Sequence, residues 1–170
     1  MTTQLFSNQN GATFSECGKY RNELHRIWDE TKPLAMCIGL NPSTANSEKN
    51  DPTIRILIDM LKILGYGGFY MLNIFTIISS KPEILLNPYM ETEGGARFWI
   101  HKIKDVCQDV IFCWGDFKEA KPRAAELKSQ FPEALCFDKS KSGAPIHPLA
   151  MQERNGRNPN NPKLIKYNNL

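Results

Sequence analysis

The sequence predicts an α/β fold in which a mostly parallel, four-stranded sheet lies between two layers of helices. Short apolar runs that end in glycine or asparagine are typical of strands buried on both faces. Segments with apolar residues at helical spacing separate these runs along the chain. Strands that alternate with helices favour parallel pairing, with helices on both faces of the sheet. The chain of 170 residues, 41% of them hydrophobic, is long enough for one such core.

The first two predicted elements are a helix at residues 20–30 and a strand at residues 34–38. In residues 20–30, apolar and aromatic side chains recur three or four positions apart, as on one face of a helix. Pro33 ends that segment, because proline disrupts a helix interior. Residues 34–38 are wholly apolar and stop at Gly39, which predicts a short buried strand.

A second helix and a second strand are expected next. Asp51 and Pro52 predict a helix start, since Asp is a favoured N-cap and Pro a favoured first helical residue. Apolar residues on one face continue this helix to Leu64. Residues 69–72 form the second apolar run, and they lead directly into Asn73.

The second half of the chain is expected to hold a helix at 96–107, a third strand at 110–114, a helix at 118–130 and a weak fourth strand at 134–137. The preceding residues 81–95 contain several Pro and Gly residues and are predicted to be irregular. Asn, Gly and Pro dominate towards the end of the chain. We therefore expect one α/β domain over residues 1–151 and a polar tail over residues 152–170, ordered at most in part.

Composition excludes several classes of protein. Lys and Arg number 21 and Asp and Glu 18, a net charge of +3 that excludes a polybasic arm or an acidic tail but does not decide for or against nucleic acid. The five cysteines include no Cys-x-x-Cys pair, and Cys37, Cys113 and Cys136 lie in apolar runs. They are interpreted as reduced thiols of a cytoplasmic protein, and we expect no metal and no cofactor.

Two segments bear on the location of the protein. Residues 1–10 are polar and lack the pattern of a signal peptide. Residues 63–80 carry no charge, but three glycines and Asn73 divide them into a helix end and a strand instead of a membrane span. We expect a cytoplasmic protein without membrane contact, and we favour a monomer.

Functional residues are expected where the strands end, because ligands of open parallel sheets bind outside the carboxyl ends of the strands. The residues at these positions are 41–44, Asn73 with Phe75, 115–116 and 143–151. No P-loop, Gly-x-Ser-x-Gly or His-Glu-x-x-His motif occurs, which argues against the enzyme classes that use those motifs.

The motifs at these strand ends follow an order typical of a known family. They are Gly39-Leu40-Asn41-Pro42-Ser43-Thr44-Ala45, Asp51-Pro52-Thr53-Ile54-Arg55, Gly65-Tyr66-Gly67-Gly68, Asn73-Ile74-Phe75, Trp114-Gly115 and Gly143-x-Pro-x-His147-Pro148-Leu149. Together with Tyr20-Arg21 and Arg26-x-Trp28, they resemble the bacterial and phage family DUF1643 from about Phe14 to Met151. The same order of motifs is remotely similar to the uracil-DNA glycosylase superfamily.

The second resemblance implies a uracil-DNA glycosylase-like, three-layer α/β/α sandwich and hydrolysis of an N-glycosidic bond. By this resemblance, Asn41 positions the water, Asn73 reads the base and His147 stabilises the leaving base. Asp51 is interpreted either as the N-cap of its helix or as the general base. The sequence departs from the superfamily in lacking a Ser after Pro148, and it lacks the four cysteines of the branch that carries an iron–sulfur cluster.

The proposed roles are chemically consistent. A neutral histidine can donate a hydrogen bond to a departing base anion, and a loop amide or carboxylate can hold water beneath the sugar. An asparagine side chain offers a donor and an acceptor to the edge of a base. Asn41 cannot act as a general base, so we expect slower turnover than with Asp at this position.

Six residues are predicted to bind substrate: Leu40, Ser43, Thr44, Asn73, Phe75 and Leu149. Ser43 and Thr44 either cap the backbone or bond to the ligand, and capping is favoured. Phe75 either stacks on a base or belongs to the core. The side chain of Leu149 could act as a wedge in DNA. The sequence leaves open whether Arg21 pairs with an acid or holds a phosphate.

The expected partner is DNA, a nucleobase or a nucleoside. Basic residues collect near the His147 loop, where they would line a DNA path: Lys139, Lys141, Arg154, Arg157, Lys163 and Lys166. Two alternatives remain open. One is a module that binds a nucleobase, a nucleotide or modified DNA without cleaving it, and the other is an enzyme that acts on a free nucleoside or small metabolite.

Overall fold

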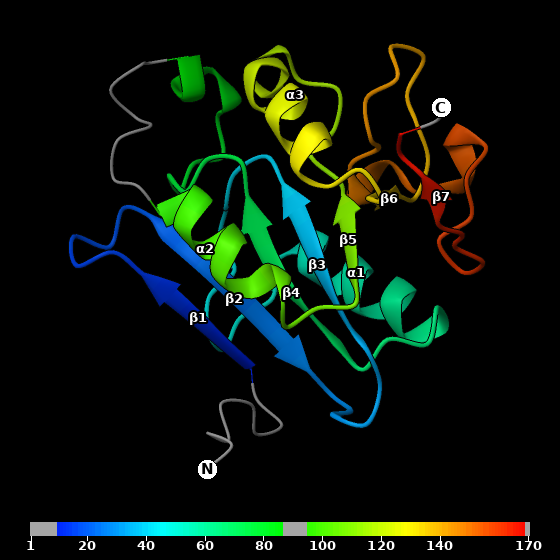
Figure 1. Cartoon of the computed structure of the whole chain (residues 1–170), viewed down its shortest axis with the longest axis horizontal. Helices are drawn as coiled ribbons and strands as arrows, with labels where there is room; N and C mark the ends of the chain where they lie inside the picture. Colours follow the sequence, from blue (N-terminus) through cyan, green and yellow to red (C-terminus); the bar gives the residue numbers. More distant parts are fainter. Residues whose placement is uncertain (1–9, 87–94, 169–170) are drawn as a thin grey trace.

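A computed structural model describes residues 10–86 and 95–168 (Figure 1). Seven strands lie in one sheet of the described residues, in the order β1-β2-β4-β3-β5-β6-β7. The strands are β1 (Asn10–Phe14), β2 (Arg21–Ile27), β3 (Leu34–Gly39), β4 (Gly68–Asn73), β5 (Asp109–Phe112), β6 (Leu135–Cys136) and β7 (Ile165–Lys166). The α-helices are α1 (Pro52–Ile63), α2 (Gly95–Lys104) and α3 (Lys121–Gln130). The 3₁₀ helices are η1 (Pro82–Leu86), η3 (Lys118–Ala120), η4 (Pro148–Ala150) and η5 (Glu153–Asn155).

The centre of the sheet is parallel, as expected. Strands β4, β3, β5 and β6 are neighbours and pair in parallel, and they correspond to the four predicted strands. The α/β class is therefore confirmed, but the sheet is wider than predicted. Antiparallel β2 and β1 extend it beyond β4, and antiparallel β7 extends it beyond β6.

The predicted helix at residues 20–30 is wrong, because these residues contain strand β2. Leu24 and Ile27 are three positions apart, which fits a helix, but in β2 they face opposite sides of the sheet and join different core clusters. The charged residues between the apolar ones were misleading as well. Arg21, Glu23 and Arg26 are all buried, whereas a surface helix would expose them.

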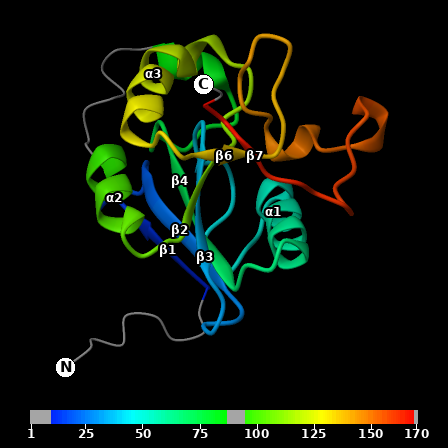
Figure 2. The ribbon, with the colours of Figure 1, turned by 45° about the vertical axis from the view of Figure 1, so that its right-hand side comes forward.

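Helices cover both faces of the sheet (Figure 2). Alternate residues of β3 show the two layers: Ala35 and Cys37 pack on the side of α1, and Met36 and Ile38 pack on the side of α2 and α3. The buried residues of α1 are Ile54, Leu57, Met60 and Leu61, and those of α2 and α3 include Ile100, Ile103 and Leu127. Two hydrophobic clusters thus stabilise the sheet from opposite sides.

The predicted start of α1 is confirmed. Oδ1 of Asp51 accepts the N–H of Ile54 at 2.9 Å, and Pro52 is the first helical residue. The helix ends near Leu64, and Gly65 follows with φ of +89°, a conformation that favours glycine. This cap fixes the helix N-terminus at the edge of the sheet where β3 and β4 end.

The segment expected as a polar tail contains η5 and β7. The N–H of Tyr167 donates to the carbonyl of Ala134 at 2.8 Å, which continues the pairing of β7 with β6. The Tyr167 ring is buried and lies against the rings of Phe112 and Trp114, at centroid distances of 5.2 and 6.0 Å. This part of the segment therefore contributes to the core.

Other expectations have mixed outcomes. The thiols of Cys37, Cys113 and Cys136 are buried and free, as predicted. The prediction for residues 81–95 is tested only in part, since 82–86 form η1 and 87–94, like 1–9, lie outside the described residues. Among the residues that are described, no helix has the length and apolar character needed to cross a bilayer.

Candidate functional site

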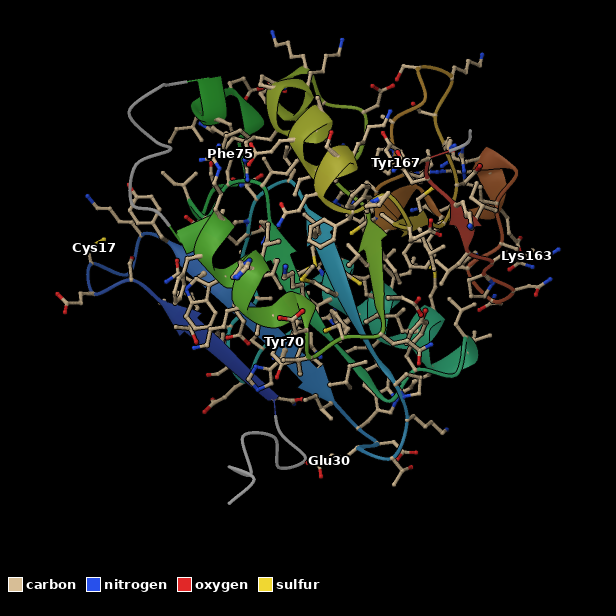
Figure 3. The ribbon with its side chains drawn as sticks, viewed as in Figure 1. Cys17, Glu30, Tyr70, Phe75, Lys163 and Tyr167 are labelled. Carbon is tan, nitrogen blue, oxygen red and sulfur yellow. The ribbon has the colours of Figure 1, made fainter. Side chains whose placement is uncertain are left out.

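A cavity of about 300 Å³ lies at the edge of the sheet where β3 and β4 end. It is lined by eight of the residues proposed from the sequence: Leu40, Asn41, Ser43, Thr44, Asp51, Asn73, His147 and Leu149. Phe75 does not line it. Its ring is 6% exposed and packs in the cluster on the side of α2 and α3, so its position matches the core alternative (Figure 3).

The register of β3 and β4 explains why these residues meet. Gly39 is paired with Asn73, so both strands reach the same edge together. The pairing continues beyond the strands, because the N–H groups of Ile74 and Phe75 donate to the carbonyls of Gly39 and Leu40, both at 2.9 Å. The loop after β3 is thereby held beside the end of β4.

Asn73 lines the cavity and has an unsatisfied polar atom. Its side chain is 3% exposed, and its Oδ1 has no hydrogen-bond partner in the described structure. The absence of a side chain at Gly39 makes room for it, because a Cβ at residue 39 would lie 2.8 Å from that oxygen. An unsatisfied buried acceptor costs about 1–3 kcal/mol, so a ligand that donates to Oδ1 would recover this energy.

His147 is held in a defined protonation state. Its Nδ1 accepts the N–H of Leu149 at 3.1 Å, and a nitrogen that accepts carries no proton. Burial lowers the pKa of the imidazole, and the nearby charge of Asp51 opposes this effect in part. The ring is therefore neutral near pH 7, with its proton on Nε2.

The loop that carries His147 is attached to β5 and to the chain after β6. The carbonyl of Pro145 accepts the N–H of Gly115 at 3.0 Å, and the N–H of Ile146 donates to the carbonyl of Asp138 at 2.9 Å. Gly115 has φ of +82°, and a Cβ there would lie 3.2 Å from Cβ of His147. A side chain at residue 115 would therefore strain the backbone and crowd the histidine.

Asn41 is fixed by its amide nitrogen. Nδ2 donates to the carbonyls of Ser79 at 2.8 Å and of Pro42 at 3.1 Å. These bonds join the loop after β3 to the loop after β4, and they leave Oδ1 as the group that can accept from water or a ligand. Ser43 and Thr44 line the cavity, and neither hydroxyl forms a capping bond among the described residues.

Asp51 acts as the N-cap of α1, as described above, and its carboxylate is 8% exposed. Only Oδ1 takes part in the cap. The second oxygen remains available at the cavity, whose lining includes Asp51 and the first residues of α1.

Arg21 also lines the cavity, and its place there was not predicted. It is 2% exposed, its Nη1 donates to the carbonyl of Ala45 at 3.0 Å, and its Nε has no partner among the described residues. Burial lowers its pKa to about 10, an effect that the charge of Asp51 opposes. Because β2 is antiparallel to β4, its first residue lies at the edge where β4 ends. Recognition of β2 as a strand would have revealed this.

The basic residues expected along a DNA path are partly neutralised. Nε of Arg157 lies 2.6 Å from Oδ2 of Asp138, and Nζ of Lys166 lies 2.9 Å from a carboxylate oxygen of Glu133. Lys163 is exposed at the outer edge of the molecule (Figure 3). In the described part of the chain, no group of three or more His, Cys, Asp or Glu residues could hold a metal ion.

Comparison with known proteins agrees with the motifs at the strand ends. No curated protein and no solved structure matches the chain. A family model described as a protein of unknown function, DUF1643, matches residues 21–149. These limits contain every residue that lines the cavity. The chain therefore belongs to the DUF1643 family.

Proposed function

We propose that the cavity recognises a nucleobase and that the protein hydrolyses the N-glycosidic bond of that base, as DNA glycosylases do. The observation that carries the proposal is the bond from the Leu149 N–H to Nδ1 of His147, which leaves the proton of the neutral ring on Nε2. A neutral donor in a cavity that is also lined by Asn73, whose amide oxygen is unsatisfied among the described residues, suits base recognition. The remote similarity to uracil-DNA glycosylases supports the same chemistry.

In the proposed reaction, the bond between the sugar C1′ and the base nitrogen breaks, and its electron pair leaves with the base. The negative charge spreads to a base carbonyl oxygen, to which Nε2–H of His147 donates. Oδ1 of Asn41 accepts a hydrogen bond from the water that adds to C1′. The proton that this water loses passes to the free carboxylate oxygen of Asp51, and solvent protonates the departed base.

The cavity is large enough to hold a single base. Its volume of about 300 Å³ is at the lower end of the range for small-molecule sites. A base in duplex DNA would have to leave the stack to enter it. Damaged, mismatched or modified bases leave most easily, which would contribute to selectivity.

A module that binds a nucleobase without cleaving it is the second candidate. The observation that favours it is the identity of Asn41, whose amide cannot take a proton from water. Asp51, the remaining candidate base, already uses one oxygen to cap α1. Both features are compatible with slow cleavage or with none.

Incubation with duplex and single-stranded oligonucleotides carrying uracil, a mismatched thymine or hydroxymethyluracil tests the proposal. We expect abasic sites that alkali converts to strand breaks on at least one substrate. His147→Asn should lower kcat at least about 100-fold, because Asn can still accept the Leu149 N–H but loses the donor at the Nε2 position.

His101→Asn is the matched control, since His101 is exposed on α2, and it should leave cleavage unchanged. Salt-dependent binding without strand breaks on any substrate would reject hydrolysis and support the binding module. Cleavage that His147→Asn leaves intact would reject the role given to this residue.

A further inference from the structure

Strand β2 contains two buried arginines with different surroundings. Arg21 and Arg26 are each 2% exposed. The guanidinium of Arg26 is surrounded by acceptors: Oδ1 of Asn50 and the carbonyls of Gly11, His25, Asn46 and Lys49. This arginine therefore has a structural role, which is to hold the segment that leads into α1.

The guanidinium of Arg21 has far fewer partners. Its one hydrogen bond among the described residues joins Nη1 to the carbonyl of Ala45, and Nε is buried without a partner. It forms no ion pair in the described part of the chain. Unlike Arg26, it lines the cavity.

The free-energy cost of burying the Arg21 guanidinium with few partners indicates a ligand. A buried charge is expensive unless it is paired, and a guanidinium can only donate hydrogen bonds. Asn73, which lines the same cavity, has the opposite deficiency, since its Oδ1 is a buried acceptor without a donor among the described residues and the residue is 3% exposed. A single ligand that offers an oxyanion and an N–H or O–H group would satisfy both.

Other features of the cavity favour negative charge. The N-terminus of the 12-residue helix α1 lines it, and the aligned peptide dipoles place partial positive charge there. The carboxylate of Asp51 offsets part of this charge while it caps the helix. Asp51 also offsets part of the charge of Arg21, since it opposes the lowering of the Arg21 pKa, but the two side chains form no direct ion pair.

We propose that Arg21 forms an oxyanion subsite, so that the cavity takes a planar, anionic heterocycle whose oxyanion lies on Arg21 and whose ring N–H lies on Asn73. The ligand class is a base-sized ring that bears a carboxylate or is itself deprotonated, in contrast to a neutral base. This inference deepens the proposed function and rests on base recognition by Asn73.

Calorimetric titration of the full chain with orotate, barbiturate and uracil tests the subsite. Orotate carries a carboxylate on the uracil ring, and barbiturate is a pyrimidine anion at neutral pH. We expect one of the two anions to bind at least tenfold more tightly than uracil. Uracil binding as tightly as both anions would overturn the proposal, and this comparison needs only the unaltered protein.

Arg21→Gln should remove the preference for the anion, whereas Arg55→Gln should keep it. Arg55 is an exposed arginine on α1 that does not line the cavity, so its loss changes the net charge equally. An unchanged preference in Arg21→Gln would reject the subsite. If Arg21→Gln does not fold, Arg21→Lys serves instead. It keeps the charge, and it should weaken binding because lysine lacks the planar, two-donor geometry.

Inorganic phosphate and uridine 5′-monophosphate distinguish the source of the oxyanion. Binding of phosphate as tight as that of orotate would overturn the heterocyclic ligand class. Tighter binding of the monophosphate than of orotate would do the same. Binding of orotate without any oligonucleotide cleavage would reject the hydrolysis proposed above and leave this inference standing.

Discussion

At the scale of single residues, two groups in the cavity are defined by the atoms they lack. Within residues 10–86 and 95–168, Oδ1 of Asn73 has no donor and Nε of Arg21 has no acceptor. The tautomer of His147 is fixed instead, because the Leu149 N–H donates to its Nδ1. The unsatisfied atoms of Asn73 and Arg21 would be stabilised by a ligand that bonds to them. The ring of His147 can donate to a ligand without rearrangement.

The protonation of His147 should appear in the stability of the protein. Its pKa is below the ordinary value of about 6.5, so the folded state favours the neutral ring. The stability from this preference is fully present above pH 6.5, and it is lost as the pH falls towards the folded-state pKa. Urea unfolding at pH 7.5 and pH 5 should show a smaller loss of unfolding free energy in His147→Asn than in the unaltered protein.

His101→Asn, which removes an exposed histidine on α2, is again the matched control. An equal loss of stability in His147→Asn and the unaltered protein would contradict the assignment of a neutral ring to His147 in the folded state.

At the scale of elements, the predictable parts are those where one signal dominates. Asp51 and Pro52 predict α1 because an N-cap residue and a proline both mark the same helix start. The apolar run before Gly39 predicts β3 because a strand buried on both faces does not alternate apolar and polar residues. Strand β2 could not be predicted in this way, because its buried positions include charged residues whose partners are distant in sequence. Arg26, for instance, bonds to Asn50.

The same reasoning explains which site residues were found. Residues that follow parallel strands, such as Asn41 and Asn73, could be placed together from the fold class alone. Arg21 could not, since its position depends on an antiparallel strand that the periodicity does not reveal.

The bonds of Arg26 predict a large effect on stability. Arg26→Gln should lower the free energy of unfolding by about 3 kcal/mol, because it removes a buried guanidinium that donates to several partly buried carbonyls. Arg21→Gln should change it far less, since one hydrogen bond is lost and an unpaired charge is removed. Urea titration of both variants measures the difference. Equal destabilisation by the two substitutions would mean that Arg21 contributes as much to the stability of the fold as Arg26.

At the scale of the whole molecule, the sheet continues through β6 to β7, so residues late in the chain complete the core on the α2 and α3 side. Tyr167 is the clearest case, because its ring packs with Phe112 and Trp114 from the centre of the sheet. The segment after residue 151 is thus structurally connected to the strands that support the His147 loop.

Tyr167→Ala should lower the free energy of unfolding by about 3 kcal/mol, as expected for truncation of a large buried ring. Ile165→Ala, two residues earlier in β7, should change it by less than about 1 kcal/mol, because Ile165 is 42% exposed. Thermal or urea unfolding of the two variants provides the comparison. A small effect of Tyr167→Ala would show that the packing of its ring against Phe112 and Trp114 contributes little to stability.

The cavity has one more consequence, which concerns how this protein can be divided. Its walls come from the first residue of β2, the ends of β3 and β4, the start of α1 and the turn at η4, so they extend from Arg21 to Leu149. The family match covers the same residues, 21–149. No shorter fragment contains the complete cavity, and a break between β4 and η4 would separate Asn73 from His147. The cavity can therefore be transferred to another protein only as one nearly whole domain.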